Sequence, residues 1–149
     1  MSPAETVTTF LEALEKGDLD EVASYLSDGF TFSGPTPRPL DRAQFLEFVG
    51  SMRRAFPNLV FNPTDLREQG STVLLTLRIT GAQSGELVLP VPGMPMVPAT
   101  GRRIALPEEP ARITVHSGKV SAFSVQPVQG GGILGVLHQL GVRLPVRTV

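Results

Sequence analysis

The chain of 149 residues has no cysteine, no tryptophan, a single tyrosine and only two histidines. The absence of cysteine excludes disulfides, thiolate metal sites and cysteine nucleophiles. The two histidines, His116 and His138, are far apart in the sequence and lack the spacing of a metal site. We therefore expect a protein without a metal ion or another cofactor.

Charge and long apolar runs are also scarce. The formal net charge is −1, whereas a nucleic-acid partner requires a concentrated positive field. No apolar run approaches the ~20 residues that span a bilayer, and residues 1–5 lack the basic start and apolar core of a signal peptide. We expect a cytoplasmic protein that binds neither nucleic acid nor membranes.

The length fits one domain, spanning residues 1–149. A chain of this size buries roughly 68–70% of its unfolded surface, which is enough for a sizeable core. The 15 glycines and 14 prolines, with only 18% charged residues, indicate long ordered loops and a covered apolar surface such as a dimer interface.

The first third of the chain predicts three helices, because apolar residues recur there at helical spacing. Asp18 and Asp41 are suitable N-caps for the second and third helices, and Gly17 and Pro57 end the first and third. The three apolar stripes are Val7, Phe10, Leu11 and Leu14; Leu19, Val22, Ala23 and Leu26; and Phe45, Phe48, Val49 and Met52.

The rest of the chain predicts strands, in which apolar and polar residues alternate. A loop is expected at residues 90–98, and the three glycines at 130–132 lead into a short helix that ends near residue 141. Helices followed by a series of strands predict α+β architecture. The expected strands are residues 30–32, 59–66, 72–80, 86–89, 103–106, 111–116 and 120–125.

Six short motifs, in this order, resemble those of the SnoaL-like polyketide cyclases, a family of the nuclear transport factor 2-like superfamily. The resemblance implies a cone-shaped fold, with N-terminal helices packed on a curved antiparallel sheet around a cavity. It also implies a homodimer. The motifs are Gly17-Asp18-Leu19, Ala55-Phe56-Pro57-Asn58, Thr80 to Gly85, Thr100-Gly101-Arg102-Arg103, Gly118-Lys119-Val120 and Gln139-Leu140-Gly141.

The departures from the family pattern fall on its acid-base residues. The family histidine corresponds to Gln83, and the family's catalytic aspartate falls near Val128. Cyclisation needs a proton acceptor within hydrogen-bond reach of the substrate, and glutamine does not take up a proton at neutral pH. The leading hypothesis is therefore a cavity that binds a small, largely apolar or aromatic molecule.

The expected ligand contacts include four polar side chains, each with an alternative role. Gln83 either faces the cavity or satisfies a backbone group at a strand end. Ser124 and Gln126 share one strand face, which is either a cavity wall or the surface, and the Tyr25 hydroxyl lies in the cavity or at the rim of the core. The apolar candidates, which either line the cavity or fill the core, are Phe10, Phe32, Phe48 and Met52.

A competing hypothesis is a cyclase, isomerase or hydrolase whose acid-base residue has moved to His116, Asp65 or Glu109. His116 lies beside a tight turn and is expected to face solvent, and Asp65 lies near the end of a strand. Glu108 and Glu109 are adjacent and point to opposite faces of a strand, so they do not form a dyad. A third hypothesis is a dimeric interaction module without a ligand.

Overall fold

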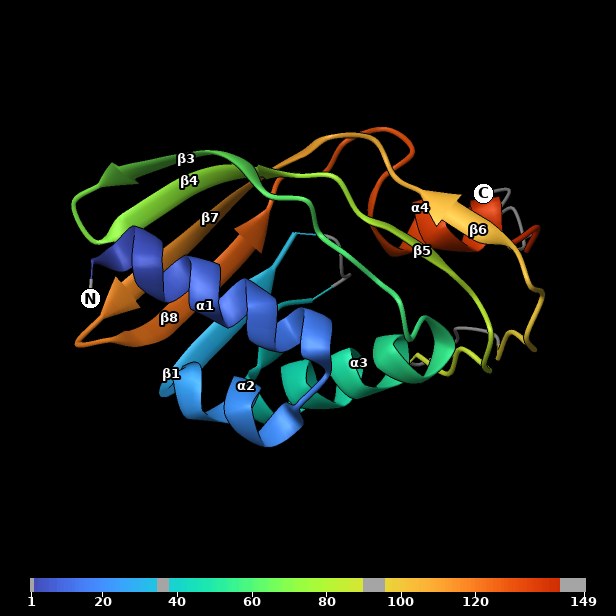
Figure 1. Ribbon diagram of the computed structural model, residues 1–149, viewed down its shortest axis with the longest axis horizontal. Helices are drawn as coiled ribbons and strands as arrows, with labels where there is room; N and C mark the ends of the chain where they lie inside the picture. Colours follow the sequence, from blue (N-terminus) through green and yellow to red (C-terminus); the bar gives the residue numbers. More distant parts are fainter. Residues whose placement is uncertain (1, 35–37, 90–95, 143–149) are drawn as a thin grey trace.

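The computed structural model describes residues 2–34, 38–89 and 96–142. Figure 1 shows helices and strands in the order expected for an α+β chain. The elements are α1 (Pro3–Lys16), α2 (Leu19–Tyr25), β1 (Leu26–Ser33), β2 (Leu40–Asp41), α3 (Arg42–Ala55), β3 (Thr64–Gln69), β4 (Thr72–Leu77), β5 (Thr80–Ala82), β6 (Arg103–Ala105), β7 (Glu109–His116), β8 (Lys119–Val125) and α4 (Gly132–Gln139).

The N-terminal helices begin at the caps that the sequence predicts, but α2 ends at Tyr25. Leu26, predicted on the apolar stripe of that helix, instead begins β1, four residues before the strand expected at 30–32. The side chain of Asp18 accepts a hydrogen bond from the Glu21 amide at the start of α2, and Asp41 accepts one from the Gln44 amide at the start of α3. Each bond satisfies an amide that has no partner within the helix. Gly17 ends α1 at a φ of 73°, in the left-handed region that glycine adopts without strain.

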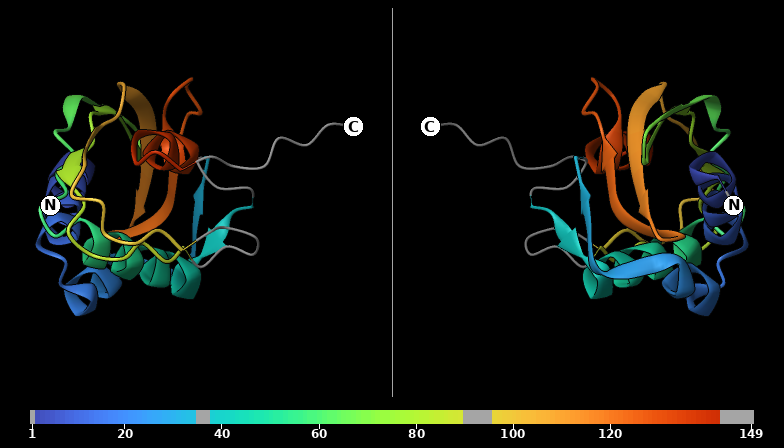
Figure 2. Two further views of the ribbon diagram at one scale, coloured as in Figure 1. Left: turned by 90° about the vertical axis from the view of Figure 1, so that its right-hand side faces the viewer. Right: turned by 90° about the vertical axis from the view of Figure 1, so that its left-hand side faces the viewer.

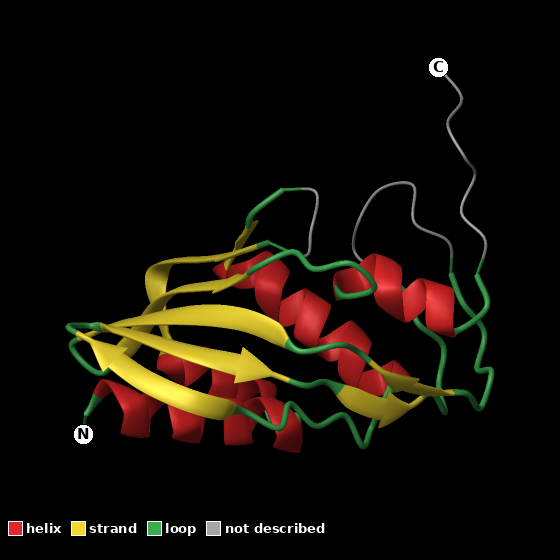
Figure 3. Cartoon of the chain, turned by 90° about the horizontal axis from the view of Figure 1, so that it is seen from above, coloured by secondary structure: helices red, strands yellow, loops and turns green. Residues whose placement is uncertain are grey.

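The main sheet has six strands in the order β2-β1-β8-β7-β4-β3. All of its pairs are antiparallel except β1 with β8, which are parallel. The sheet curves, and α1 and α3 pack against one of its faces (Figures 2 and 3). The predicted α+β fold with helices on a curved, largely antiparallel sheet is therefore confirmed, as is the short C-terminal helix.

Two hydrophobic clusters hold the molecule together. The larger one joins α1, α2 and α3 to the main sheet, and the smaller one joins the end of α3 to β6, α4 and the paired residues Leu87 and Val97. Phe48 and Ile79 pack against both clusters. The two clusters therefore meet along α3 and along the chain that follows β4.

Several strands differ from the sequence-based expectation. The strand expected at 72–80 divides into β4 and β5, because the chain leaves β7 after Leu77 and the Arg78 amide bonds to the carbonyl of Phe61. The strand expected at 59–66 begins only at Thr64, and the one expected at 86–89 is a single bridge.

Two further differences concern the ends of elements. β7 begins at Glu109, two residues earlier than expected, and this places Glu109 in the sheet. Most of the loop expected at 90–98 lies outside the described residues. Within the part of the chain that the structure describes, no helix is long and apolar enough to cross a membrane.

Candidate functional site

A cavity of about 100 Å³ lies at the junction of the two hydrophobic clusters. α3 forms one wall, the ends of β4, β7 and β8 form another, and the first two turns of α4 close one side. Nearly all of the lining side chains are apolar, and the two exceptions are Arg53 and Glu109. The lining is therefore apolar except at these two residues.

Four phenylalanines form a continuous aromatic wall of the cavity: Phe32, Phe45, Phe48 and Phe123. The ring centroid of Phe32 is 5.0 Å from that of Phe45, 6.0 Å from that of Phe48 and 5.1 Å from that of Phe123. These separations are typical of favourable aromatic pairs, which add to the energy of burial. The wall is thus a packed unit contributed by β1, α3 and β8.

Glu109 enters the cavity because of its position in β7. Side chains at alternate residues of a strand share a face, and Glu109 is in phase with the buried Ala111 and Ile113. It pairs in register with Leu77 of β4, which also lines the cavity. As a result its side chain is only 2% exposed.

The two carboxylate oxygens of Glu109 have different surroundings. Oε2 accepts a hydrogen bond from the amide of Gly132, at 3.1 Å. Oε1 is buried and has no hydrogen-bond partner among the described residues. Burial raises the pKa of Glu109 above its ordinary value of 4.5, and the bond from Gly132 acts in the opposite direction. The carboxyl group is therefore a stronger base than an exposed glutamate.

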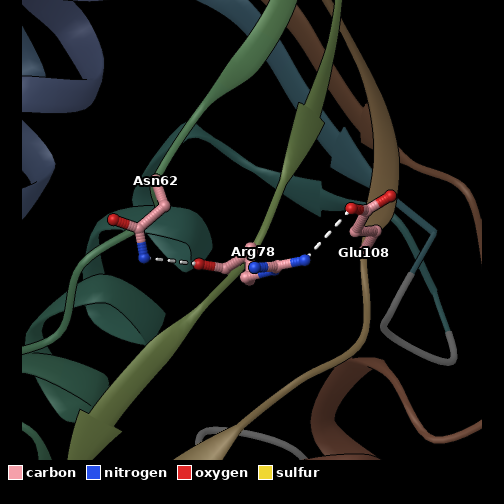
Figure 4. A network of polar contacts seen from close by, with 3 residues as sticks. All are labelled: Asn62, Arg78 and Glu108. Carbon is pink, nitrogen blue, oxygen red and sulfur yellow. Dashed lines mark hydrogen bonds and ion pairs between the residues drawn. The ribbon is translucent and has the colours of Figure 1, made fainter.

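The neighbouring carboxylate, Glu108, is outside the cavity. It pairs with Arg78 at 3.2 Å, and both side chains are more than 60% exposed. Figure 4 shows this pair, together with the bond from Asn62 to the Arg78 carbonyl. An exposed ion pair of this kind contributes little to stability. Glu108 and Glu109 thus provide a surface carboxylate and a cavity carboxylate at adjacent positions.

Arg53 reaches the edge of the cavity from the last turn of α3. Its Nη1 atom donates a hydrogen bond of 2.6 Å to the carbonyl of Glu15, at the end of α1. The side chain passes so close to Gly17 that a Cβ there would lie 2.3 Å from its Nε atom. The guanidinium group is therefore held against the end of α1.

Three of the four apolar residues proposed as ligand contacts line the cavity: Phe32, Phe48 and Met52. Phe10 does not line it and is fully buried in the larger cluster. The half-buried Tyr25 packs its ring edge-on against Phe10, with centroids 6.3 Å apart. Tyr25 does not line the cavity either. Its position corresponds to the alternative in which its ring packs in the core.

Gln83 is buried, but it is not among the residues that line the cavity. Its Nε2 atom lies within 3.0–3.3 Å of the carbonyl oxygens of Gly85, Val97 and Pro98. Its Oε1 atom accepts bonds from both the amide and the hydroxyl of Thr100. These bonds tie together the two ends of the segment 85–98, and they correspond to the backbone-satisfying alternative.

Ser124, Gln126 and Asp65 lie together, but on the opposite side of the sheet from the helices. They line an open groove of about 530 Å³ with Arg67 and Arg112. Of the expected catalytic candidates, Asp65 is thus outside the cavity. His116 is exposed at the end of β7, beside the turn that leads to β8, as the sequence predicts. The structure brings only Glu109 into the cavity.

Sequence reasoning missed Arg53 and the first turn of α4 as parts of the site. It placed Phe45 on the apolar stripe of the third helix, among the residues that either fill the core or line a pocket. Arg53 follows Val49 by four residues, so it continues the stripe predicted for the third helix by one turn. Extending that stripe by one turn would have found Arg53. No local signal marks Gly132 or Ile133, because the path of the chain after β8 decides where α4 lies.

The comparisons with known proteins agree with this geometry. The model of the SnoaL-like domain matches residues 7–123. This chain belongs to the SnoaL-like domain family. No curated protein is significantly similar to it in sequence. In the described residues, no group of three or more histidine, aspartate or glutamate side chains is placed to hold a metal ion.

Solved structures show the same fold. A candidate polyketide cyclase from Xanthomonas campestris pv. campestris has a TM-score of 0.70 at 18% identity, over 93% of this chain and 96% of its own. An NTF2-like protein from Cytophaga hutchinsonii has a TM-score of 0.58 at 16% identity, over 84% and 88%. An LEH-like epoxide hydrolase from M. tuberculosis has a TM-score of 0.67 at 14% identity, over 93% and 92%.

Proposed function

We propose that this SnoaL-like protein binds a small, largely apolar or aromatic molecule in the cavity and that Glu109 exchanges a proton with it. One observation carries the proposal: Glu109 Oε1 is buried without a partner among the described residues, and the other residues that line the cavity, apart from Arg53, are apolar. A buried polar atom without a hydrogen bond costs free energy. A ligand with a polar group at this point would remove that cost.

The volume of the cavity limits the ligand. A cavity of roughly 150 Å³ in another protein holds benzene, whereas this one measures about 100 Å³. As it stands, the cavity takes a few heavy atoms or the end of a longer molecule. A fused-ring polyketide would enter only if α4 moved aside. The substrate we propose is accordingly a small carbonyl compound or a larger one that inserts its carbonyl end.

The chemistry we propose is proton transfer at the carbon next to the carbonyl. Oε1 of ionised Glu109 removes the proton, and the electrons of the C–H bond form an enolate. The protonated carboxyl then returns the proton to the same atom or to another one, which exchanges or isomerises the substrate. The raised pKa of Glu109 favours this step, because a stronger base lowers the barrier to removing the proton.

The structural neighbours have different named activities. A candidate polyketide cyclase and an epoxide hydrolase have this fold. The neighbours show the fold alone, so the reaction of this chain is argued from Glu109.

Hydrogen–deuterium exchange of simple ketones tests the proposal. We would incubate the protein with acetone or cyclopentanone in D₂O and follow loss of the ¹H signal beside the carbonyl. We expect the protein to speed up the exchange above the rate in buffer alone. In Glu109→Gln this protein-catalysed rate should fall by roughly 10²-fold or more, because general acid–base catalysis contributes a factor of that size. Glu108→Gln removes a carboxylate one residue away and is expected to keep the wild-type rate.

A binding protein without a reaction is the second candidate. It is favoured by the residues that replace the family's acid-base groups, among them Gln83 and the apolar Val128. In that case cyclopentanone would shift the NMR signals of the four phenylalanines without any exchange of its hydrogens. If cyclopentanone caused neither NMR shifts nor hydrogen exchange, both candidate functions would be contradicted.

The expected homodimer stays a prediction, which light scattering tests against the 16.0 kDa mass of one chain.

A further inference from the structure

Helix α4 lies against β6, and the segment 105–109 leads from β6 into β7 (Figure 1). The end of the helix meets the start of the segment, because Gln139 bonds to Ala105. The middle of the helix meets the next residue, since a Cβ on Gly135 would lie 3.4 Å from Leu106. The contacts therefore run in antiparallel order along the two pieces of chain.

The first turn of α4 completes the series at Glu109, through the bond from the Gly132 amide. The two pieces have similar lengths. Seven residue steps of helix cover about 10 Å, and four residue steps of extended chain cover about 13 Å. The helix thus spans the distance from Ala105 to Glu109 and is attached at both ends.

The attachment at the far end is a two-point amide contact. Gln139 Oε1 accepts from the Ala105 amide at 2.7 Å, and Gln139 Nε2 donates to the Ala105 carbonyl at 2.9 Å. Two bonds to one residue fix the orientation of the helix as well as its position. The start of α4 gives little resistance to rotation, because Gly130, Gly131 and the first helical residue Gly132 have no side chains, and Gly130 and Gly132 have a positive φ.

We propose that Gln139 is a positioning residue for Glu109, acting through α4. By holding the end of the helix on β6, it keeps the Gly132 amide on Oε2 and keeps Ile133 and Val136 over the cavity. Oε1 is then the oxygen that faces a ligand. The proposal rests on the function proposed for Glu109, but its test requires no ligand.

The other charged groups around Glu109 are few in the described chain. Arg53 of α3 lines the same cavity. Glu108 turns outward to Arg78. The one titratable side chain on α4, His138, is exposed. The contribution of α4 to the titration of Glu109 is therefore the Gly132 amide and the exclusion of water.

The test is an NMR titration of the Glu109 side-chain carboxyl carbon in the full chain, assigned with Glu109→Gln. In Gln139→Ala the helix end is released, so the Gly132 bond weakens and water reaches the carboxyl group. Burial is the larger influence on Glu109, and its loss is expected to lower the pKa toward the ordinary value. Exchange of the Gly132 amide hydrogen should become about tenfold faster, because two hydrogen bonds are lost.

Leu134→Ala is the matched control, because Leu134 is on the same helix with a 59% exposed side chain and does not line the cavity. It should leave both measurements unchanged. If Gln139→Ala does not fold, Gln139→Asn keeps the amide group on a shorter side chain and should move both measurements in the same direction. An unchanged pKa with a lowered melting temperature would overturn the proposal and make Gln139 a purely structural residue. Absence of ketone exchange would overturn the function proposed for Glu109 and leave this titration unaffected.

Discussion

Glu109 Oε2 lies 3.1 Å from the amide nitrogen of Gly132, the first residue of α4. Gly131, at the N-cap position of that helix, has no side chain with which to accept such a bond. Glu109 therefore does from β7 what a capping side chain usually does from within the helix. A carboxylate near a helix N-terminus is also stabilised by the helix dipole. One carboxyl group thus joins the sheet, the final helix and the cavity.

The stability of the protein should depend on pH through Glu109. Its pKa is higher in the folded state than the ordinary 4.5, so above pH 4.5 the folded state binds more protons than the unfolded state. The free energy of unfolding contributed by this group is therefore greatest below pH 4.5 and falls as the pH rises through the folded pKa. Urea unfolding at a series of pH values, compared with Glu109→Gln, measures the contribution. A wild-type minus variant difference that rises with pH would contradict the sign.

Gly131→Ala should disturb the carboxyl group while leaving the fold intact. A Cβ at Gly131 would lie 3.0 Å from Glu109 Oε2 and 2.8 Å from Val128 Cγ2. The flexible carboxyl group must move away from the Gly132 amide, and the loss of that bond should raise the pKa of Glu109 further. Gly29→Ala is the control, because a Cβ there meets nothing within 4 Å. An NMR titration of Glu109 in the wild type and in both variants tests this prediction. A Glu109 titration in Gly131→Ala that is identical to the wild-type titration would count against the contact.

Gln83→Leu should destabilise the protein by about 3 kcal/mol. The substitution conserves shape but leaves buried carbonyl and amide groups of the 85–100 segment without partners, each at a cost of about 1–3 kcal/mol. Urea unfolding measures the loss. Gln126→Leu, on an exposed side chain, should change stability by less than about 0.5 kcal/mol. Weakened binding of cyclopentanone with unchanged stability would instead make Gln83 a ligand contact.

The fold was predictable from the sequence to the extent that local signals specify it. The caps Asp18 and Asp41 and the stripe from Phe45 to Met52 each depend on residues a few positions apart, and all appear in the structure. The break after Leu77 was not predictable in this way, because it depends on the Arg78 amide meeting the Phe61 carbonyl across the fold.

The site was only partly predictable for a similar reason. Glu109 was among the catalytic candidates, but the sequence placed it before the strand expected at 111–116, in a charged loop or edge, whereas the structure extends β7 to Glu109 and buries its side chain. What the sequence could not indicate is that α4 returns to Glu109 from 23 residues away and supplies its hydrogen bond. Gln83 differs from Glu109. It occupies a position where the family has an acid-base residue, yet its side chain is bonded to backbone groups and to Thr100 and does not line the cavity.

The parallel pair of β1 and β8 has a consequence for how the chain folds during synthesis. β1 ends at Ser33 and β8 begins at Lys119. At roughly 5–20 residues per second, a ribosome takes about 4–17 s to make the residues between them. During that interval β1 has only β2 beside it, and the β1–β2 pair is not yet joined to the part of the sheet that contains β7, β4 and β3. The main sheet therefore becomes continuous only after β8 has been made, and a contact so distant in sequence also slows folding.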